Sequence, residues 1–324
     1  MEGDPYQEGN HHCPKEDQES QRIYPQQVSI NKDQGLLRKP LNAMISAQAL
    51  PLYHLLFACV GCWKRPILGL GHMLVRWTLV ALTAITVILG TCGHQQHTLL
   101  VAAAADLRFA ALDLVAAFEE ECQCQVNTIF ASSGTLNAQI RGGLRADVLL
   151  SAHRSNVDQL REEGLVIPET IRIYALGLLA LATPASSPLE AHTVQDLADS
   201  RFRRIAIANP QHAPYGQVAQ ELLIAAGLWT SVQPRLVIAD NVAQVFQWVE
   251  EGQVDAALIS VSLAIVSAKV KWVLVEPELY EPLPQAGAVL SRAPSPQLAR
   301  QFLDLVTGPR GREILARYGF ILPS

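Results

Sequence analysis

From Leu99 to the end of the chain, short apolar runs alternate with amphipathic stretches. Apolar runs of about four to eight residues between polar or glycine residues predict buried strands, whereas apolar residues three and four apart predict helices. The runs that predict strands are 99–103, 126–130, 147–151, 204–208, 236–239, 256–260 and 272–275. The longer apolar run 173–182 could cross from one lobe to another. The stretches that predict helices are 107–121, 135–141, 156–163, 194–198, 216–226, 241–251, 297–307 and 310–318. This alternation indicates an α/β fold with mainly parallel sheets whose faces are covered by helices.

The loops that follow the predicted strands are the places to look for function. Parallel sheets bind ligands at the carboxyl ends of their strands, where the N-termini of helices meet. We therefore expect functional residues just after Ala103, Phe130, Ala208, Ala239 and Ile259.

The N-terminal part of the chain has a different pattern. Residues 1–50 are rich in polar residues and proline and have weak periodicity, which predicts disorder. Residues 77–90 are apolar and uncharged and follow Arg76, but this run is shorter than the roughly 20 residues of a spanning helix. We predict a signal peptide or membrane anchor over 73–92. Since Met73 would open that segment, we interpret 1–72 as a disordered extension that translation from Met73 would omit.

The end of the predicted export segment contains a cysteine. Residues 89–92 (LGTC) resemble the cleavage box of bacterial lipoproteins, although Thr91 departs from the small residue expected before the cysteine. Lipidation at Cys92, simple cleavage and an uncleaved anchor all remain open. In each case the domain that follows is predicted to be periplasmic, or extracytoplasmic and membrane-associated.

Composition excludes some classes of protein. A hydrophobic fraction of 49% and a charged fraction of 17% fit a globular fold, and a net charge of -5 gives no support to nucleic-acid binding. The six cysteines form no disulfide-dense pattern, and we expect Cys122 and Cys124 to be free thiols. The Cys59 and Cys62 pair has zinc-like spacing but no second pair at a suitable distance.

Several segments in series resemble one known family. They are 101–107 (VAAAADL), 130–136 (FASSGTL), 143–148 (GLRADV), 209–216 (NPQHAPYG), 240–242 (DNV), the strand 254–260, and 308–309 (GP) with 318–320 (YGF). In this order and spacing they resemble the periplasmic molybdate-binding proteins of ABC transporters, which have the type II periplasmic-binding-protein fold. The resemblance extends from about Leu99 to Leu322.

This resemblance implies a fold and a function. It implies a two-lobed protein, with lobe I formed by 99–175 and 272–324 and lobe II by 176–271. Such a protein captures molybdate or tungstate between its lobes and delivers it to the membrane permease of an ABC importer. It implies a binding protein that is not an enzyme, that needs no cofactor and acts as a monomer. Molybdenum would be held as an oxyanion, with no direct bond from protein to metal.

The resemblance also implies ligand contacts. They fall on Ala105, Ser133, Tyr215, Val242 and Ser260. Ser133 would contribute its hydroxyl and backbone, and Tyr215 and Val242 their backbone N–H groups. Ala105 stands where the family has a serine and Ser260 where it has a tyrosine.

Two neighbouring residues are secondary candidates, Ser132 and Asp106. Asp106 would bring a negative charge to an anion site and weaken binding unless it points away or pairs with Arg108. Neutral donors at helix N-termini otherwise suit an anion, because the partial positive charge of each helix end favours it.

Parts of the sequence are compatible with other functions. A hydrolase could use Ser133, His212 and Asp147, but no Gly-x-Ser-x-Gly elbow is present, and His212 is better explained as a loop residue. A membrane-tethered oxyanion sensor is an alternative if Met1 is the true start. Within the receptor class, sulfate or phosphate could replace molybdate, because sequence alone does not fix the size of the cavity.

Overall fold

The computed structural model describes residues 98–323. The predicted extension over 1–72, the predicted signal or anchor over 73–92 and the predicted lipidation of Cys92 lie outside the described residues. Within 98–323, none of the helices combines the length and apolar character that crossing a membrane requires.

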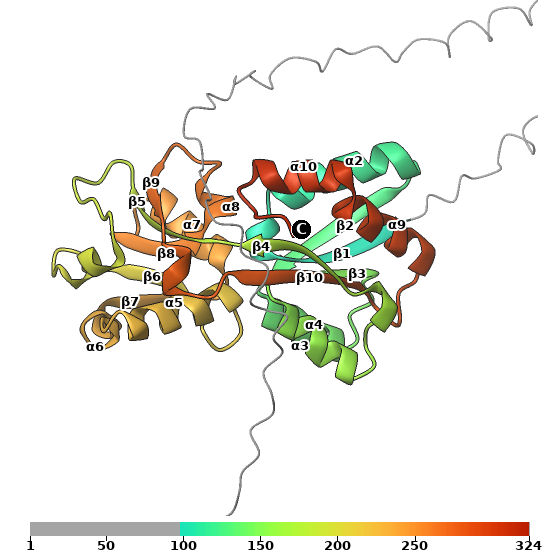
Figure 1. Cartoon of the computed structure of the whole chain (residues 1–324), viewed down its shortest axis with the longest axis horizontal. Coiled ribbons are helices and arrows are strands. Elements are labelled where there is room, and N and C mark those ends of the chain that lie inside the picture. Colours follow the sequence, from blue (N-terminus) through green and yellow to red (C-terminus); the bar gives the residue numbers. More distant parts are fainter. Residues whose placement is uncertain (1–97, 324) are drawn as a thin grey trace, which may run out of the picture. The chain divides into compact units, whose positions relative to one another are not determined.

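Two five-stranded sheets form the framework (Figure 1). The first has the order β2-β1-β3-β10-β4, and the second has the order β7-β6-β8-β5-β9. The strands of the first are β1 (Thr98–Ala104), β2 (Gln125–Ala131), β3 (Val148–Ser151), β4 (Arg172–Gly177) and β10 (Leu283–Val289). Those of the second are β5 (Leu179–Pro184), β6 (Ile205–Ala208), β7 (Leu236–Ala239), β8 (Ala256–Ser260) and β9 (Val270–Leu274). Only β10 and β5 run against the other strands of their sheets, so the mainly parallel α/β fold is confirmed.

Helices cover both sheets and define two lobes. The helices on the first sheet, in lobe I, are α2 (Ala110–Cys122), α3 (Ser133–Arg141), α4 (Arg154–Glu162), α9 (Pro296–Thr307) and α10 (Pro309–Arg317). Those on the second sheet, in lobe II, are α5 (Pro214–Ala225), α6 (Trp229–Val232), α7 (Val242–Glu250) and α8 (Val261–Ala264). In Figure 1, α3 and α4 lie on the opposite side of the first sheet from α2, α9 and α10. The 3₁₀ helices are η2 (Ala105–Leu107), η3 (Pro168–Thr170), η4 (Val194–Ala198), η5 (Gln233–Arg235) and η6 (Pro277–Leu279).

The chain crosses between the lobes at two places. The apolar run 173–182 crosses between the lobes as predicted, because β4 ends in the first sheet at Gly177 and β5 begins the second at Leu179. The return crossing lies between Leu274 and Leu283, because the whole of β9 pairs with β5. The boundary expected at 271/272 therefore cuts through β9, whose residues 272–274 belong to the second sheet.

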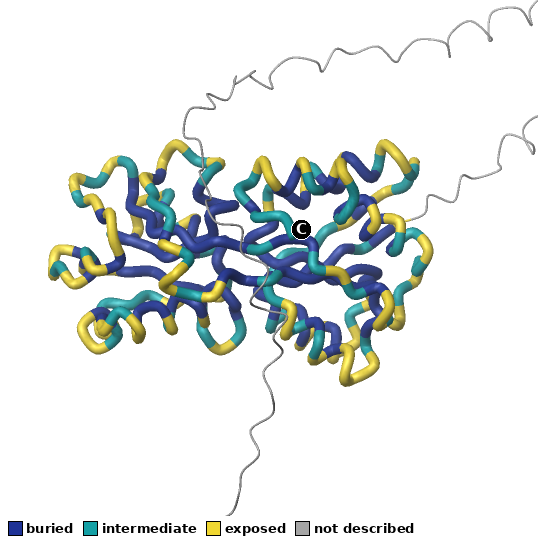
Figure 2. Tube along the Cα trace, viewed as in Figure 1, coloured by how far each residue is buried: buried dark blue, intermediate teal, exposed yellow. Residues whose placement is uncertain are grey.

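Both lobes contain many buried residues, and Figure 2 shows the trace coloured as buried through the middle of each. In lobe I, one apolar cluster lies under α2, α9 and α10 and another under α3 and α4. The cluster of lobe II extends to Ala104, Ala105 and Ala152 of lobe I. Apolar packing is thus continuous across the boundary between the lobes at the end of β1.

Cys122 and Cys124 form a disulfide, so the expectation that they are free thiols is wrong. Helix α2 ends at Cys122, and Gln123 then adopts a left-handed conformation with φ of 52°. This turn brings the Cα atoms of the two cysteines to 5.2 Å, within the range that a disulfide spans.

Asp147 is a structural residue of lobe I. Its carboxylate accepts the Leu100 N–H at 2.8 Å and the Ser295 N–H at 2.7 Å, and its side chain is buried. Replacing Asp147 by alanine leaves both donors without their acceptor, so we expect a loss of roughly 2–5 kcal/mol in the free energy of unfolding. Urea denaturation measures this loss. Asp147→Asn keeps one acceptor oxygen and should lose less, whereas equal stability of all three proteins would contradict this role.

Candidate functional site

A small pocket lies between the two lobes, where the N-terminal ends of several helices meet. Its lining comes from η2, from the first turns of α3, α5 and α7, from the residues just before them, and from Ala152 after β3. The lining residues are Ala104, Ala105, Asp106, Ser132, Ser133, Ala152, Ala213, Pro214, Tyr215, Asn241 and Val242. The cavity volume is about 10 Å³, so in this arrangement the pocket has room for about one water molecule.

The first turn of α3 brings Ser133 to the pocket. Ser132 is the N-cap, and its Oγ accepts the Thr135 N–H at 3.3 Å. Ser133 is fully buried, and its Oγ accepts the Ala152 N–H at 3.0 Å. That bond occupies an acceptor site of the hydroxyl and leaves its proton available to a ligand.

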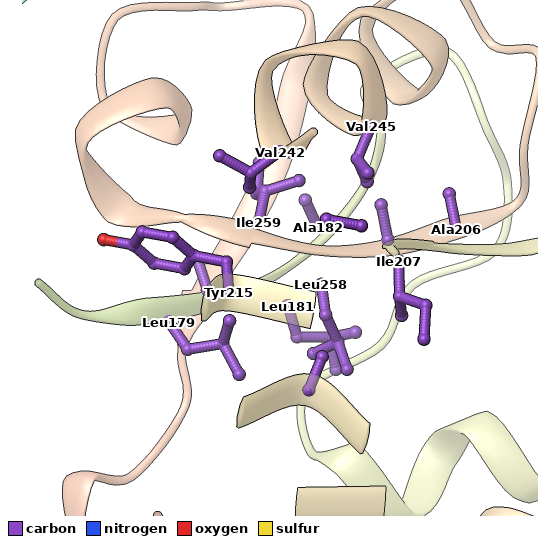
Figure 3. Packing of buried hydrophobic residues seen from close by; sticks show 14 of the residues in the cluster. Leu179, Leu181, Ala182, Ala206, Ile207, Tyr215, Val242, Val245, Leu258 and Ile259 are labelled. Carbon is purple, nitrogen blue, oxygen red and sulfur yellow. The ribbon is translucent and has the colours of Figure 1, made fainter. Parts of the chain in front are cut away.

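Tyr215 and Val242 contribute backbone rather than side chain. Their side chains are buried in the apolar cluster of lobe II, where Figure 3 shows them among Leu179, Ile259 and Val245. Val242 is the first residue of α7 and Tyr215 the second of α5, positions at which the N–H has no acceptor within the helix. The packed side chains therefore fix the direction of two free N–H groups.

The starts of these two helices are fixed locally by sequence. Pro214 opens α5 at a position where a missing N–H costs nothing. Asn241 caps α7, and its side chain accepts the Gln244 N–H at 3.1 Å. Both Pro214 and Asn241 line the pocket, although the family resemblance implies neither as a contact.

Asp106 lies in a buried polar network at the base of the pocket. One carboxylate oxygen, Oδ2, accepts the Gln285 side-chain N–H at 2.5 Å, and the Tyr215 hydroxyl lies 3.3 Å from the same nitrogen. The Tyr174 hydroxyl donates to Gln285 Oε1 at 2.9 Å and also lies 3.0 Å from the Ser151 carbonyl. The anticipated partner is absent from this network: Arg108 is exposed, and within 98–323 no salt bridge joins it to Asp106.

Burial raises the pKa of Asp106 from 3.8 to about 6, although the hydrogen bond from Gln285 and the nearby backbone N–H groups and Tyr215 hydroxyl oppose the rise. Between these two pKa values the folded protein holds more protons than the unfolded chain, so its stability falls as pH rises. About two pH units at 1.36 kcal/mol each correspond to roughly 3 kcal/mol.

We therefore expect Asp106→Asn to raise the free energy of unfolding of the ligand-free protein by roughly 3 kcal/mol at pH 8 and by little at pH 4. Urea denaturation at both pH values measures the difference. A gain of the same size at pH 4 and pH 8 would show that the carboxylate charge is not its cause.

Hydrogen bonds cross from lobe to lobe beside the pocket. The Gly134 N–H donates to the His212 carbonyl at 2.8 Å, and His212 Nδ1 lies 2.8 Å from Ser132 Oγ. On another side, the Ser262 hydroxyl donates to the Asp106 carbonyl at 2.8 Å. The lobes are thus in contact around the pocket, which is the closed arrangement.

Of the sequence-predicted contacts, the structure brings Ala105, Ser133, Tyr215 and Val242 together, with Ser132 and Asp106 beside them. Ser260 differs, because it does not line the pocket. It is buried before α8, and its hydroxyl is hydrogen-bonded to that of Ser262 at 3.0 Å, so it reaches the site only through Ser262.

The side chains of a hydrolase are not assembled. His212 contacts Ser132 rather than Ser133, and both carboxylate oxygens of Asp147 accept backbone N–H groups in lobe I. Within 98–323, no cluster of three His, Cys, Asp or Glu side chains could hold a metal ion. The pocket is equipped to hold a ligand through hydrogen bonds.

Comparisons with known proteins agree with the resemblance seen in the sequence. The model of the family "Bacterial extracellular solute-binding protein" matches residues 99–321. The molybdate-binding protein ModA of Azotobacter vinelandii is 28% identical over 71% of this chain and 92% of its own length. ModA of Rhodobacter capsulatus is 28% identical over 68% of this chain and 87% of its own.

A solved structure extends the comparison to the fold. The periplasmic molybdate-binding protein of Azotobacter vinelandii superposes with a TM-score of 0.66 at 28% identity, over 70% of this chain and 100% of its own. The two-lobed fold predicted from the sequence is confirmed, as is the prediction of a binding protein rather than an enzyme. The chain belongs to the family of bacterial extracellular solute-binding proteins.

Proposed function

We propose that this protein captures molybdate or tungstate outside the cytoplasm and delivers it to the permease of an ABC importer. Two relatives bear the name of molybdate-binding proteins, and each is covered over most of its length. The proposal assigns the contacts to Ser133, Tyr215 and Val242, with the backbone of Ala105 beside them. No cofactor takes part, and the oxyanion is the transported substrate.

The observation that carries the proposal is the convergence of three helix N-termini on one small pocket. Helices α3, α5 and α7 each direct their first N–H groups there, and each end favours an anion by roughly 0.3–2 kcal/mol. Neither lysine nor arginine lines the pocket. Neutral donors hold a dianion without leaving a buried positive charge in the empty protein.

The cross-lobe bonds support a capture mechanism in which the lobes close on the anion by hinge motion. The segments at Leu178 and between Leu274 and Leu283 would act as the hinge, because there the chain passes from sheet to sheet. The closed form, acting as a monomer, would dock on the permease. Export by residues 73–92, with Cys92 as a candidate lipid attachment site, would place it outside the cytoplasm.

Titration calorimetry with molybdate, tungstate, sulfate and phosphate tests the ligand. We expect molybdate and tungstate to bind at least about tenfold more tightly than sulfate, which corresponds to roughly 1.4 kcal/mol. Equal affinities would contradict the molybdate assignment, and heat with sulfate or phosphate alone would reassign the receptor to that anion.

A substitution at Ser133 tests the position of the pocket. Ser133→Ala removes a hydroxyl donor to a charged ligand, worth about 1.5–3 kcal/mol, so we expect molybdate affinity to fall roughly tenfold or more. Ser155→Ala, which removes an exposed hydroxyl of α4, is the control and should bind like the native protein. Unchanged affinity of Ser133→Ala would place the anion elsewhere.

A further inference from the structure

Asp106 is the one charged side chain among the residues that line the pocket. It is 1% exposed, so water does not screen its charge from a neighbouring ligand. Its two oxygens are unequal. Oδ2 accepts the Gln285 N–H, while Oδ1 is buried without a hydrogen-bond partner in the part of the chain that the structure describes. A buried carboxyl oxygen left unpaired beside a pocket is available to bond a ligand there.

No positive charge faces this carboxyl from the elements packed against it. The neighbouring groups are neutral. The Gln285 amide of β10 donates to the carboxylate, and the hydroxyls of Tyr215 on α5 and Tyr174 on β4 are bonded to that amide. The Ser262 hydroxyl of α8 donates to the backbone carbonyl of Asp106. Helix α7 adds one ionisable side chain, Glu250, at its far end, where it is bonded to Ser267. The two tyrosines stay neutral, since burial and the charge of Asp106 raise the pKa of each well above its ordinary value.

An ionised Asp106 and a bound dianion would repel each other across a pocket from which water is largely excluded. A nearby negative charge raises the pKa of a carboxyl beyond what burial does alone. Burial has already brought the pKa of Asp106 to about 6, so the carboxyl is poised to take up a proton when a second negative charge arrives.

We propose that Asp106 is a proton-linked ligand contact: it takes up one proton from solvent with the anion, and the neutral carboxyl donates its O–H to an anion oxygen. The proton binds a carboxyl oxygen, and no bond of the anion is broken. This inference rests on the proposed function and adds to it that the site binds a proton together with the oxyanion. The protonation state of Asp106 then determines how tightly the site holds the anion, because the carboxyl that would repel the anion becomes a donor to it.

We expect the affinity for the anion to fall as pH rises. Below about pH 6 the free protein already holds the proton, and binding takes up none. Above it, each anion bound brings one proton, so affinity falls by about tenfold for each pH unit while the complex stays protonated. Molybdate is suited to this test because it remains a dianion throughout that range and brings no proton of its own.

The test is calorimetry of the purified protein with molybdate at pH 5.5 and pH 8, in pairs of buffers with different heats of ionisation. The difference in binding heat between the two buffers of a pair gives the number of protons taken up. We expect close to one proton at pH 8, fewer at pH 5.5, and affinity at least about tenfold weaker at pH 8. Tight molybdate binding with no proton uptake and equal affinity at both pH values would overturn the inference and leave the proposed function intact. Absence of molybdate binding at either pH would overturn the proposed function itself.

Two variants locate the proton. Asp106→Asn should take up no proton, show equal affinity at both pH values, and bind molybdate at least about tenfold more tightly than the native protein at pH 8. Asp304→Asn, which removes an exposed carboxylate of α9, should keep the native pH dependence. Proton uptake that persists in Asp106→Asn would assign the proton to another group. The proton count of the native protein decides the question even if Asp106→Asn folds poorly.

Discussion

Replacing Val242 by proline is expected to weaken molybdate binding by roughly 10- to 100-fold while leaving α7 folded. Proline removes a backbone N–H, and a hydrogen bond to a charged group is worth about 1.5–3 kcal/mol. Val242 is the first residue of α7, where proline is well tolerated. The preceding residue, Asn241, has φ of -155° and ψ of 168°, the extended conformation that proline requires of its neighbour.

The matched control is Val242→Ala, which shortens the same buried side chain but keeps the N–H. Calorimetry on both variants separates the loss of the donor from the loss of packing in the cluster of lobe II. We expect Val242→Ala to stay close to native affinity and Val242→Pro to lose it. Equal affinities of the two variants would mean that this N–H does not contact the anion.

Gly134→Ala is expected to reduce molybdate affinity by roughly 100-fold or more by preventing closure of the lobes. A Cβ at this position would lie 2.6 Å from the His212 carbonyl oxygen and 2.9 Å from its Cα, both of them backbone atoms of the opposite lobe. The apparent affinity is proportional to the fraction of the protein that can still close. A closed state destabilised by about 3 kcal/mol therefore lowers the affinity by roughly 100-fold. Alanine favours helix over glycine, so lobe I itself should be at least as stable.

Gly142→Ala is the control, since it lies at the other end of α3 and its nearest neighbour, 3.3 Å away, is the Ala138 carbonyl of the same helix. Calorimetry gives the affinity, and small-angle scattering with and without molybdate reports closure. Gly134→Ala should keep the same scattering profile when molybdate is added, whereas Gly142→Ala should contract. Native affinity in Gly134→Ala would contradict the need for this close cross-lobe contact.

Much of the fold is predictable because its strands and helices carry strong patterns. The uninterrupted apolar runs of β1, β3, β6 and β8 belong to strands buried on both faces, and glycine ends the helices where expected. Gly164 after α4 and Gly227 after α5 have φ near 70°, a conformation that glycine adopts without strain.

The strand that no local pattern predicts is β10, because its formation depends on distant parts of the chain. Strand β10 contains Pro284, Gln285 and Gly287, so it has no continuous apolar run. It is a strand because β3 and β4 flank it on both sides. The sheet to which β9 belongs is likewise decided by its pairing with β5, which no local pattern reports.

The difference between local patterns and distant contacts also separates the predictable part of the site from the rest. Ser133, Tyr215 and Val242 follow predicted strands in segments that resemble a known family, so their approach to one pocket was expected. The setting of Asp106 was not, because its partner Gln285 lies on the missed strand, 179 residues further along the chain. The sequence suggests Arg108 as the partner of Asp106 because it lies two residues away, but Arg108 is exposed.

A compact oxyanion is proposed to bind where α3, α5 and α7 begin. Crystals grown with tungstate test this position, because anomalous scattering from tungsten locates the anion independently of the protein. We expect one strong anomalous peak between the backbone N–H groups of Ser133, Tyr215 and Val242, with a carboxyl oxygen of Asp106 within hydrogen-bond distance of an anion oxygen. A peak elsewhere on the protein, with this pocket empty in a closed molecule, would contradict it.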